Sequence, residues 1–375
     1  MPTNSRRERS DGEPNWEQQA PAAAPPRGSA GFDAPKKRLT INDIARLAGV
    51  SKRTVSRVIN GIPNVQLNKR ERIEELVQLL GFVPHSLARG LALNRSFLVG
   101  FVYDNPNSQY IVNLQRGILD VLPGKALGLV VHPIDHSSPS YLTDLRAFVR
   151  RQRLASVILP PPLSEIDEIG AALASENCAS IRIASVSFQG AGHMVVTHDY
   201  LGGRAAARHL VRLGHSTFGC VVGPVCFRSS YERRRGFEAG LAESGLMLEP
   251  SCIKTGAYTF ESGVACGRAL LTMSPRPTAI FAGNDEMACG LYVAAREQGL
   301  RIPEDLSVVG YDDAPVARHM TPSLTTIRLP TREMGQAAAH MCVSLQDAEA
   351  ARQVIEFAPV FVERDSTAPA RSRLS

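Results

Sequence analysis

A short cluster of hydrogen-bonding side chains lies between Ser51 and Arg57. Lysine and arginine in such a cluster can donate to guanine edges and to phosphate oxygens, and hydroxyl groups can donate to phosphate as well. This chemistry suits the groove of a nucleic acid if one rigid element presents the side chains together. The side chains in question are Lys52, Arg53, Thr54, Ser56 and Arg57.

The apolar residues from Leu39 to Gly61 predict two short amphipathic helices that could present this cluster. Gly49 permits a sharp turn between the helices, and Ser51 can cap the second one. A third helix over Asn68–Leu80 would cover the backs of the first two. This is a helix-turn-helix pattern, although two short helices around a glycine turn also occur in domains that do not bind DNA. The apolar positions of the first two helices are Ile41, Ile44, Ala45 and Ala48, then Val50, Val55, Val58 and Ile59.

The positive charge is concentrated in the same part of the chain. Residues 36–95 contain 12 Lys or Arg against 4 Asp or Glu, whereas residues 1–35 and residues 96–375 each sum to −1, within a total of +6. Only the helix-turn-helix part is then expected to meet phosphate. A solvated basic face is the alternative.

The composition and the motifs that are absent exclude other classes of protein. The seven cysteines are scattered, without a CxxC or Cys/His ligand spacing, and are expected to be reduced core residues. No apolar run approaches the ~20 residues of a membrane span, and no signal-peptide pattern starts the chain, so we expect a cytoplasmic protein without membrane contact. The GxxxxGK[ST], GxSxG, HExxH and GxGxxG motifs do not occur, so neither an enzyme nor a cofactor is predicted.

Composition also predicts the order of the domains. We expect a disordered tail over residues 1–37, because residues 1–35 hold six Pro and six Ala but no Leu, Ile or Val. A DNA-binding domain over 38–84 and a linker over 85–96 should follow, then a large body over 97–367 and a C-terminal tail over 368–375. Within the linker, Gly90 interrupts a short helical pattern at a cost of about 1 kcal/mol, so this helix should be marginal alone.

From Phe97 onward, apolar runs of strand type alternate with helical patterns. Such alternation predicts an α/β fold of doubly wound parallel sheets, and roughly 260 residues exceed one compact sheet, so two lobes with a cleft between them are expected. The predicted strands are Phe97–Tyr103, Leu127–His132, Ser156–Leu159, Ile181–Val186, Met194–Thr197, Phe218–Val222, Thr278–Ala282 and Leu306–Tyr311. The predicted helices include Gln109–Leu122, Tyr141–Gln152, Gly202–Leu213, Tyr231–Ser244, Ser262–Met273 and Glu286–Gln298.

Several motifs together resemble the lactose-repressor (LacI/GalR) family of bacterial transcription regulators. They are TINDIARLAGVSKRTVSRVING, HSLARGLALNRS, HLVRLGHSTFGCVVG, SSYERRRGFEAGL, PTAIFAGNDEMACGLYVAAREQGLRIPEDLSVVGYDD, TPSLTTIRLP and FVERDST. The resemblance runs from about Thr40 to Thr367. It implies a helix-turn-helix head piece, a hinge helix, and a two-lobed body like that of periplasmic sugar-binding proteins. It also implies a homodimer on a palindromic operator, with a small effector in the cleft. Only eight residues follow Thr367, too few for a tetramer-forming coiled coil.

The same resemblance assigns roles on the DNA side. Lys52, Arg53 and Arg57 match positions that read base edges, and Arg57 is the strongest candidate for a bidentate guanine contact. Leu91, with Ala88 beside it, matches the hinge leucine that enters the minor groove. Positions that contact or orient the DNA backbone are matched by Thr40, Ser51, Thr54, Ser56 and Asn60.

In the cleft, the resemblance assigns Arg233, Asn284 and Asp312 to effector binding. Such side chains offer paired donors or acceptors suited to sugar hydroxyls, so a sugar is expected. A purine-like corepressor and, from a different class, a sugar-modifying α/β enzyme are the alternatives. Pro160-Pro161-Pro162 stands where some members place a polar ligand. The remaining candidates are Tyr258, as a stacking or core residue, and Asn105, Gln109 and Tyr110 from the opposite lobe.

Overall fold

The computed structural model describes residues 39–59, 62–82, 97–125, 127–188, 192–345 and 351–371. The described residues fall into two compact units, one on either side of residues 83 and 84. The expected N-terminal tail and the expected hinge with Ala88 and Leu91 lie outside the described residues, as does Asn60. No helix among the described residues is long and apolar enough to cross a membrane.

The N-terminal unit is a small helical domain that contains the predicted helix-turn-helix. Gly49 has a φ of 67°, a left-handed conformation that glycine adopts without strain, and it turns the chain between the first two helices. Ser51 caps the second helix, since its Oγ accepts a hydrogen bond from the Thr54 amide at 3.1 Å. Buried apolar side chains from the three helices meet in one core. The helices are α1 (Ile41–Ala48), α2 (Lys52–Ile59) and α3 (Leu67–Leu79).

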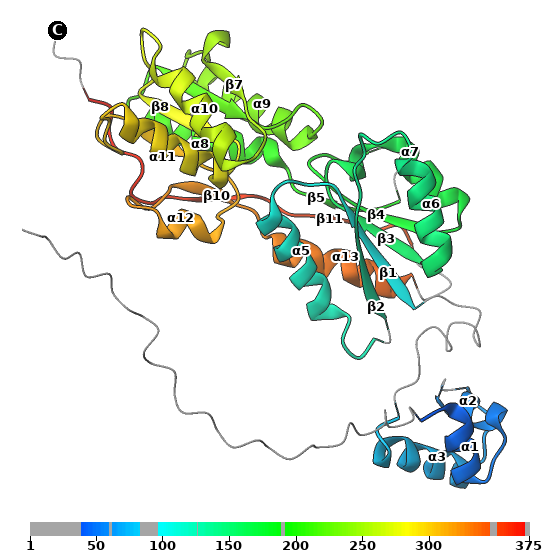
Figure 1. The fold of residues 1–375 in the computed structure, drawn as a ribbon. Helices are drawn as coiled ribbons and strands as arrows, with labels where there is room; N and C mark the ends of the chain where they lie inside the picture. Colours follow the sequence, from blue (N-terminus) through cyan, green and yellow to red (C-terminus); the bar gives the residue numbers. More distant parts are fainter. Residues whose placement is uncertain are drawn as a thin grey trace, which may run out of the picture. The chain divides into compact units, whose positions relative to one another are not determined.

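Lobe 1 of the second unit is a parallel six-stranded sheet with helices on both faces (Figure 1). Its strand order is β11-β5-β4-β3-β1-β2. Helices α5 and α13 cover one face and helices α6 and α7 cover the other, each over its own apolar core. The elements are β1 (Leu98–Tyr103), α5 (Ser108–Val121), β2 (Gly128–Pro133), α6 (Tyr141–Gln152), β3 (Ser156–Leu159), the 3-10 turn η2 (Leu163–Glu165), α7 (Asp167–Ser175), β4 (Ala179–Ala184), β5 (His193–Val196), α13 (Thr331–Ser344) and β11 (Val354–Glu356).

Lobe 2 has a parallel four-stranded sheet in the order β7-β6-β8-β9 and an antiparallel pair, β10 with β12. Its helices surround one large apolar core. The elements are α8 (Asp199–Arg212), β6 (Phe218–Val222), α9 (Arg228–Ala242), η3 (Pro250–Cys252), β7 (Ile253–Thr255), α10 (Phe260–Leu271), β8 (Ala279–Ala282), α11 (Asp285–Glu297), β9 (Ser307–Val309), α12 (Pro315–His319), β10 (Thr326–Arg328) and β12 (Val360–Val362).

The described chain passes between the lobes at three places. It leaves lobe 1 after β5, returns between β10 and α13, and leaves again between β11 and β12 (Figure 1). Lobe 1 is therefore built from two separate parts of the sequence. The predicted parallel α/β fold in two lobes is confirmed, and the eight predicted strands are all present, with ends displaced by at most two residues.

One detail of the sequence interpretation is wrong. Cys226 is exposed and Cys289 is half-buried, so the cysteines are not all core residues. Cys226 lies in the loop between β6 and α9, where the chain leaves the sheet. Within the expected C-terminal tail, the Ala368 amide donates to Ser307 Oγ at 3.1 Å and the Ala370 amide donates to the Leu213 carbonyl at 2.8 Å.

Candidate functional site

A cavity with about 430 Å³ of empty space, its open mouth included, lies between the two lobes. Loops at the carboxyl ends of the parallel strands supply most of its lining, as expected for a doubly wound fold. Lobe 1 contributes Asn105, Asn107, Tyr110, Pro161, Ile183, Ala184 and Ser185; lobe 2 contributes Phe227, Ser229, Arg233, Tyr258, Asn284 and Asp312; and the crossing segments contribute Thr197, Asp199 and Leu329.

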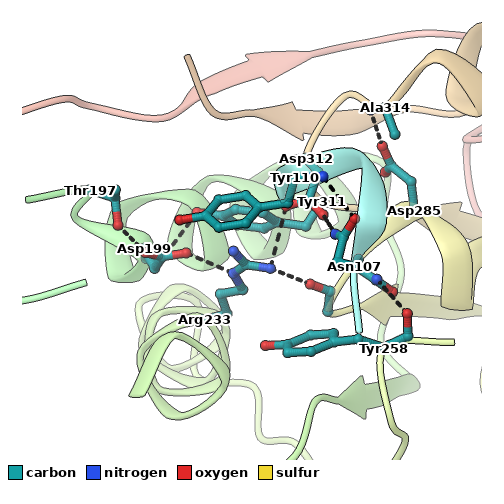
Figure 2. A network of polar contacts seen from close by, with 12 residues as sticks. Asn107, Tyr110, Thr197, Asp199, Arg233, Tyr258, Asp285, Tyr311, Asp312 and Ala314 are labelled. Carbon is teal, nitrogen blue, oxygen red and sulfur yellow. Dashed lines mark hydrogen bonds and ion pairs between the residues drawn. The ribbon is translucent and has the colours of Figure 1, made fainter. Parts of the chain in front are cut away.

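Arg233 is the centre of the polar network in this cavity (Figure 2). Its Nε donates to Asp199 Oδ1 at 2.7 Å, its Nη1 donates to the Gly283 carbonyl at 2.5 Å, and Nη1 lies 3.6 Å from Asp312 Oδ1. Burial alone would lower the pKa of Arg233, but the two carboxylates outweigh it and raise that pKa. The guanidinium is therefore a fixed, permanently charged donor.

The packing of α8 against α9 sets the position of Arg233. Gly203 lies where the two helices cross, and a Cβ at this position would be 2.0 Å from the Arg233 carbonyl oxygen. Only glycine allows the backbones to come this close, which brings Asp199 at the start of α8 within reach of Arg233. The Tyr311 ring packs against the guanidinium, with Cζ of Arg233 3.7 Å from the ring centroid.

Asp312 follows β9 in a backbone conformation that favours glycine, with φ of 111°. Tyr258, across the cavity lining, has φ of 61°. Non-glycine residues in such conformations are uncommon and gather at functional sites. Burial raises the pKa of Asp312 to about 6, with Asp199 adding to the effect and Arg233 opposing it.

Hydrogen bonds join the lobes around the cavity. Asn107 Nδ2 donates to Asp312 Oδ2 at 2.8 Å, while Asn107 Oδ1 accepts from the Tyr110 amide and thereby caps α5. At a second place, the amide of Arg228, at the start of α9, donates to Glu165 Oε2 at 2.8 Å. Burial raises the pKa of Glu165 to about 7, although the hydrogen bond from Arg228 opposes the shift.

Asn284 and Tyr258 form a linked pair in lobe 2. Asn284 Oδ1 caps α11 by accepting from the Met287 amide at 2.9 Å, and its Nδ2 donates to the Tyr258 carbonyl at 3.0 Å. The Tyr258 ring packs edge-on against Phe227, with ring centroids 5.2 Å apart. Among the described residues, the buried hydroxyls of Tyr258 and Ser185 have no hydrogen-bond partner of good geometry, although both residues line the cavity.

The structure brings six of the seven predicted cleft residues to the cavity and leaves out Gln109. Gln109 is not among the lining residues, and its Nε2 donates to Asn113 Oδ1 one helical turn further along α5. Successive helix residues point about 100° apart, so Tyr110 and Gln109 cannot both face the cavity.

The sequence interpretation missed five polar lining residues: Asn107, Ser185, Thr197, Asp199 and Ser229. Asp199 and Thr197 follow β5, and their position in THDY, directly after an apolar run, is the signal that could have found them. Asn107 stands before an amphipathic helix in NPNSQY, where it could have been read as an N-cap. Ser185 follows β4 without a distinguishing pattern.

The predicted DNA-contacting side chains lie on or beside the first two helices of the head piece. Lys52, Arg53 and Arg57 are exposed on α2. Thr40 begins α1, and both its amide and its hydroxyl donate to Asp43 Oδ2, at 2.9 and 2.7 Å. The remaining residues are engaged locally: Ser51 and Thr54 bond each other through their hydroxyls at 2.9 Å, and Ser56 is half-buried.

Comparison with known proteins decides the family. Residues 40–85 match the bacterial regulatory proteins of the lacI family, and residues 207–367 match the periplasmic binding protein-like domain. Catabolite control protein A of Priestia megaterium is 30% identical over 339 residues, which cover 88% of this chain and 99% of that protein. The chain belongs to the LacI family. It is a DNA-binding transcriptional regulator with a ligand-binding domain, and not an enzyme.

Other LacI-family proteins match over similar lengths. The ribose operon repressor of Escherichia coli K12 is 29% identical over 332 residues, covering 87% of this chain and 99% of that protein. The repressor PurR of Haemophilus influenzae is 30% identical over 304 residues, covering 80% and 89%.

Two solved structures of LacI-family regulators share the fold and cover 88% of this chain and 100% of theirs. The lac repressor dimer bound to operator and the anti-inducer ONPF has a TM-score of 0.77 at 28% identity. The complex of the regulator CelR with cellobiose has a TM-score of 0.66 at 27% identity.

Proposed function

We propose that this LacI-family protein is a cytoplasmic repressor of carbohydrate-utilisation genes, whose affinity for a palindromic operator is set by a sugar in the interlobe cavity. The observation that carries the sugar assignment is the network of Asp199, Arg233 and Asp312. Its carboxylates accept, and its guanidinium donates, hydrogen bonds of the kind that vicinal hydroxyls form.

The apolar part of the cavity supports the same assignment. Tyr110, Phe227 and Tyr258 line it next to the polar network. A sugar ring has apolar C–H faces and a polar edge, so it can pack on aromatic rings while its hydroxyls meet the charged groups. Two similar proteins are also named for sugars: one is a ribose operon repressor, and the other is a regulator solved as a complex with cellobiose.

On the DNA side, we propose that α2 enters the major groove as the recognition helix. Its exposed Lys52, Arg53 and Arg57 would read base edges, with Thr40, Ser51, Thr54, Ser56 and Asn60 fixing the helix on the phosphate backbone. The protein would bind as a homodimer, as the lac repressor does in the matching structure. The domain boundaries remain those expected from composition: residues 38–84, 85–96 and 97–367.

Effector and operator would be coupled through the linker. In this proposal residues 85–96 form a hinge helix only on DNA, and Leu91, with Ala88, enters the minor groove. A change of lobe angle in the body would alter the spacing of the two hinges in a dimer and thus their ability to pair. Coupling of this type is typically worth about 1–3 kcal/mol.

The test combines calorimetry with operator binding by the full-length protein. We expect at least one neutral sugar to bind and to change operator affinity in gel-shift titrations. Arg57→Ala should cost about 1–3 kcal/mol of specific affinity while sugar binding is unchanged. Binding of hypoxanthine or guanine, with no response to sugars, would instead support a purine-like corepressor, the alternative consistent with the match to PurR.

A further inference from the structure

The charges around the cavity are unbalanced. Among the lining residues, Arg233 is the one cationic side chain, whereas Asp199 and Asp312 are both carboxylic acids. The lobe 1 part of the lining consists of neutral side chains, including Asn105, Asn107 and Ser185. The lining as a whole therefore carries a charge of −1 when both carboxylates are ionised.

The hydrogen bonds that Arg233 already forms limit how many of its N–H groups can bind a ligand. An arginine holds a phosphate or carboxylate best with two parallel N–H groups on neighbouring nitrogens. Here Nε is occupied by Asp199, and Nη1 is occupied by the Gly283 carbonyl and faces Asp312. Only Nη2 forms no hydrogen bond to the described residues (Figure 2). Each pair of neighbouring nitrogens, Nε with Nη2 and Nη1 with Nη2, therefore contains one nitrogen that is already occupied, so neither pair can hold a ligand group in a bidentate manner. The remaining nitrogen can serve a single hydroxyl or carbonyl oxygen.

Two described cationic or basic side chains near the cavity, those of Arg228 and His136, are already engaged by carboxylates. Glu165 lies at the junction of the lobes, with its Oε2 on the Arg228 amide. The Arg228 side chain donates to the buried Glu232 at 3.0 Å. On the lobe 1 loops, His136 Nδ1 lies 2.5 Å from Asp104 Oδ2. The Arg228 guanidinium is therefore already paired with a carboxylate.

We propose that the cavity selects uncharged polyhydroxyl ligands, free sugars or polyols, and rejects their phosphorylated and carboxylated forms. This inference rests on the proposed sugar-responsive function and narrows it to one ligand class. A negative charge on the ligand, about 6 Å from the net negative charge of the lining in a site of intermediate polarity, weakens binding by about 100-fold. The acidic pair thus acts as a filter against sugar phosphates.

The experiment compares matched ligands on the full-length protein at pH 8, where Asp312, with a pKa of about 6, is ionised. The pairs are ribose with ribose 5-phosphate, glucose with glucose 6-phosphate, and glucose with glucuronate, measured by calorimetry. For any sugar that binds, the charged partner should bind about 100-fold more weakly. Equal or tighter binding of a phosphate ester or uronate would overturn the inference and leave the sugar-responsive function standing.

Variants separate charge from shape. Asp312→Asn keeps the size of the side chain and removes one negative charge. The ratio of the affinity for the neutral sugar to the affinity for its charged partner should therefore fall about tenfold, even if both affinities are lower than in the wild type. Asp144→Asn, an exposed carboxylate on α6, makes the same charge change outside the cavity lining and should leave the ratio unchanged. An unmoved ratio in Asp312→Asn overturns the inference. If purine bases bind and no sugar or polyol does, the proposed function itself fails.

Discussion

Arg233 and Asp199 form a buried ion pair whose members cannot be removed singly. The two residues are 7% and 1% exposed. Breaking a buried pair by removing one partner typically costs about 3–5 kcal/mol, because the other charge is left without compensation. We therefore expect Arg233→Ala to lower the free energy of unfolding by this amount, besides any loss of effector binding.

A double substitution tests this explanation. Asp199→Asn combined with Arg233→Met removes both charges and keeps most of the volume, so chemical denaturation should show most of the stability restored. If the double variant is as unstable as Arg233→Ala, the loss comes from packing against Tyr311 and not from the unpaired carboxylate.

Glu165 gives the protein a pH dependence that can be assigned to one residue. Its pKa rises from 4.5 to about 7 in the folded protein because of burial, so the folded state disfavours the ionised form. Below pH 4.5 the carboxyl is protonated in both states and costs nothing. Between pH 4.5 and 7 the cost grows, and above pH 7 it is constant.

Glu165→Gln keeps an oxygen for the Arg228 amide but cannot ionise. The stability of this variant relative to the wild type should therefore increase by about 1–2 kcal/mol between pH 5 and pH 8, a figure reduced for partial exposure. Urea denaturation at the two pH values measures it. A difference between the proteins that does not change with pH would show that Glu165 titrates normally.

At the scale of the elements, the crossing of α8 and α9 depends on Gly203. A methyl group there would meet the Arg233 carbonyl at 2.0 Å, and backbone atoms cannot yield as a flexible side chain can. We expect Gly203→Ala to force the helices apart, to lower the free energy of unfolding by about 1–3 kcal/mol, and to weaken effector binding by displacing Arg233 from Asp199.

Gly192→Ala is the matched control for this substitution. The nearest atom to a Cβ at Gly192 is the Ser180 carbonyl oxygen at 3.6 Å, an ordinary contact. Thermal melts and calorimetry should find this control close to the wild type. Wild-type stability and affinity in Gly203→Ala would mean that the crossing adjusts without moving Arg233.

Much of the secondary structure could be predicted, because the spacing of apolar residues along the chain shows which face of each helix or strand is buried. Alternation of apolar runs and helical faces placed β3 and β6 at their observed bounds. The sequence pattern could not assign α13 and β11 to lobe 1, because the apolar pattern of a helix or strand does not show which sheet it joins. The family resemblance placed Arg233 in the cavity, but no sequence signal did so for Asn107, whose cleft role depends on the distant Asp312.

At the scale of the whole molecule, Asn107 joins the lobes and caps α5 with the same amide. Asn107→Asp should preserve the cap, since its carboxylate can accept from the Tyr110 amide, but it would place a second negative group against Asp312. Loss of a hydrogen bond to a charged group costs about 1.5–3 kcal/mol. We therefore expect the cleft to open.

Small-angle scattering of the protein without effector should show a larger radius of gyration for Asn107→Asp than for the wild type. The difference should shrink at pH 5, where Asp312 takes up a proton. Asp144→Asn serves as the control of unchanged dimensions. An identical scattering curve for Asn107→Asp and wild type at pH 8 would contradict a role of this bond in holding the lobes together.

The return of α13 to lobe 1 also has a consequence during translation. Val196 ends β5 and Thr331 begins α13, so 134 residues separate the two parts of lobe 1. At ribosomal rates of about 5–20 residues per second, the sheet face that α13 covers would stay uncovered for roughly 10 seconds in each nascent chain. A chain translated from an mRNA truncated before the codon of Thr331 would lack α13, so this sheet face would stay uncovered. Such a product should be bound by chaperones or degraded before its head piece could compete for operator sites.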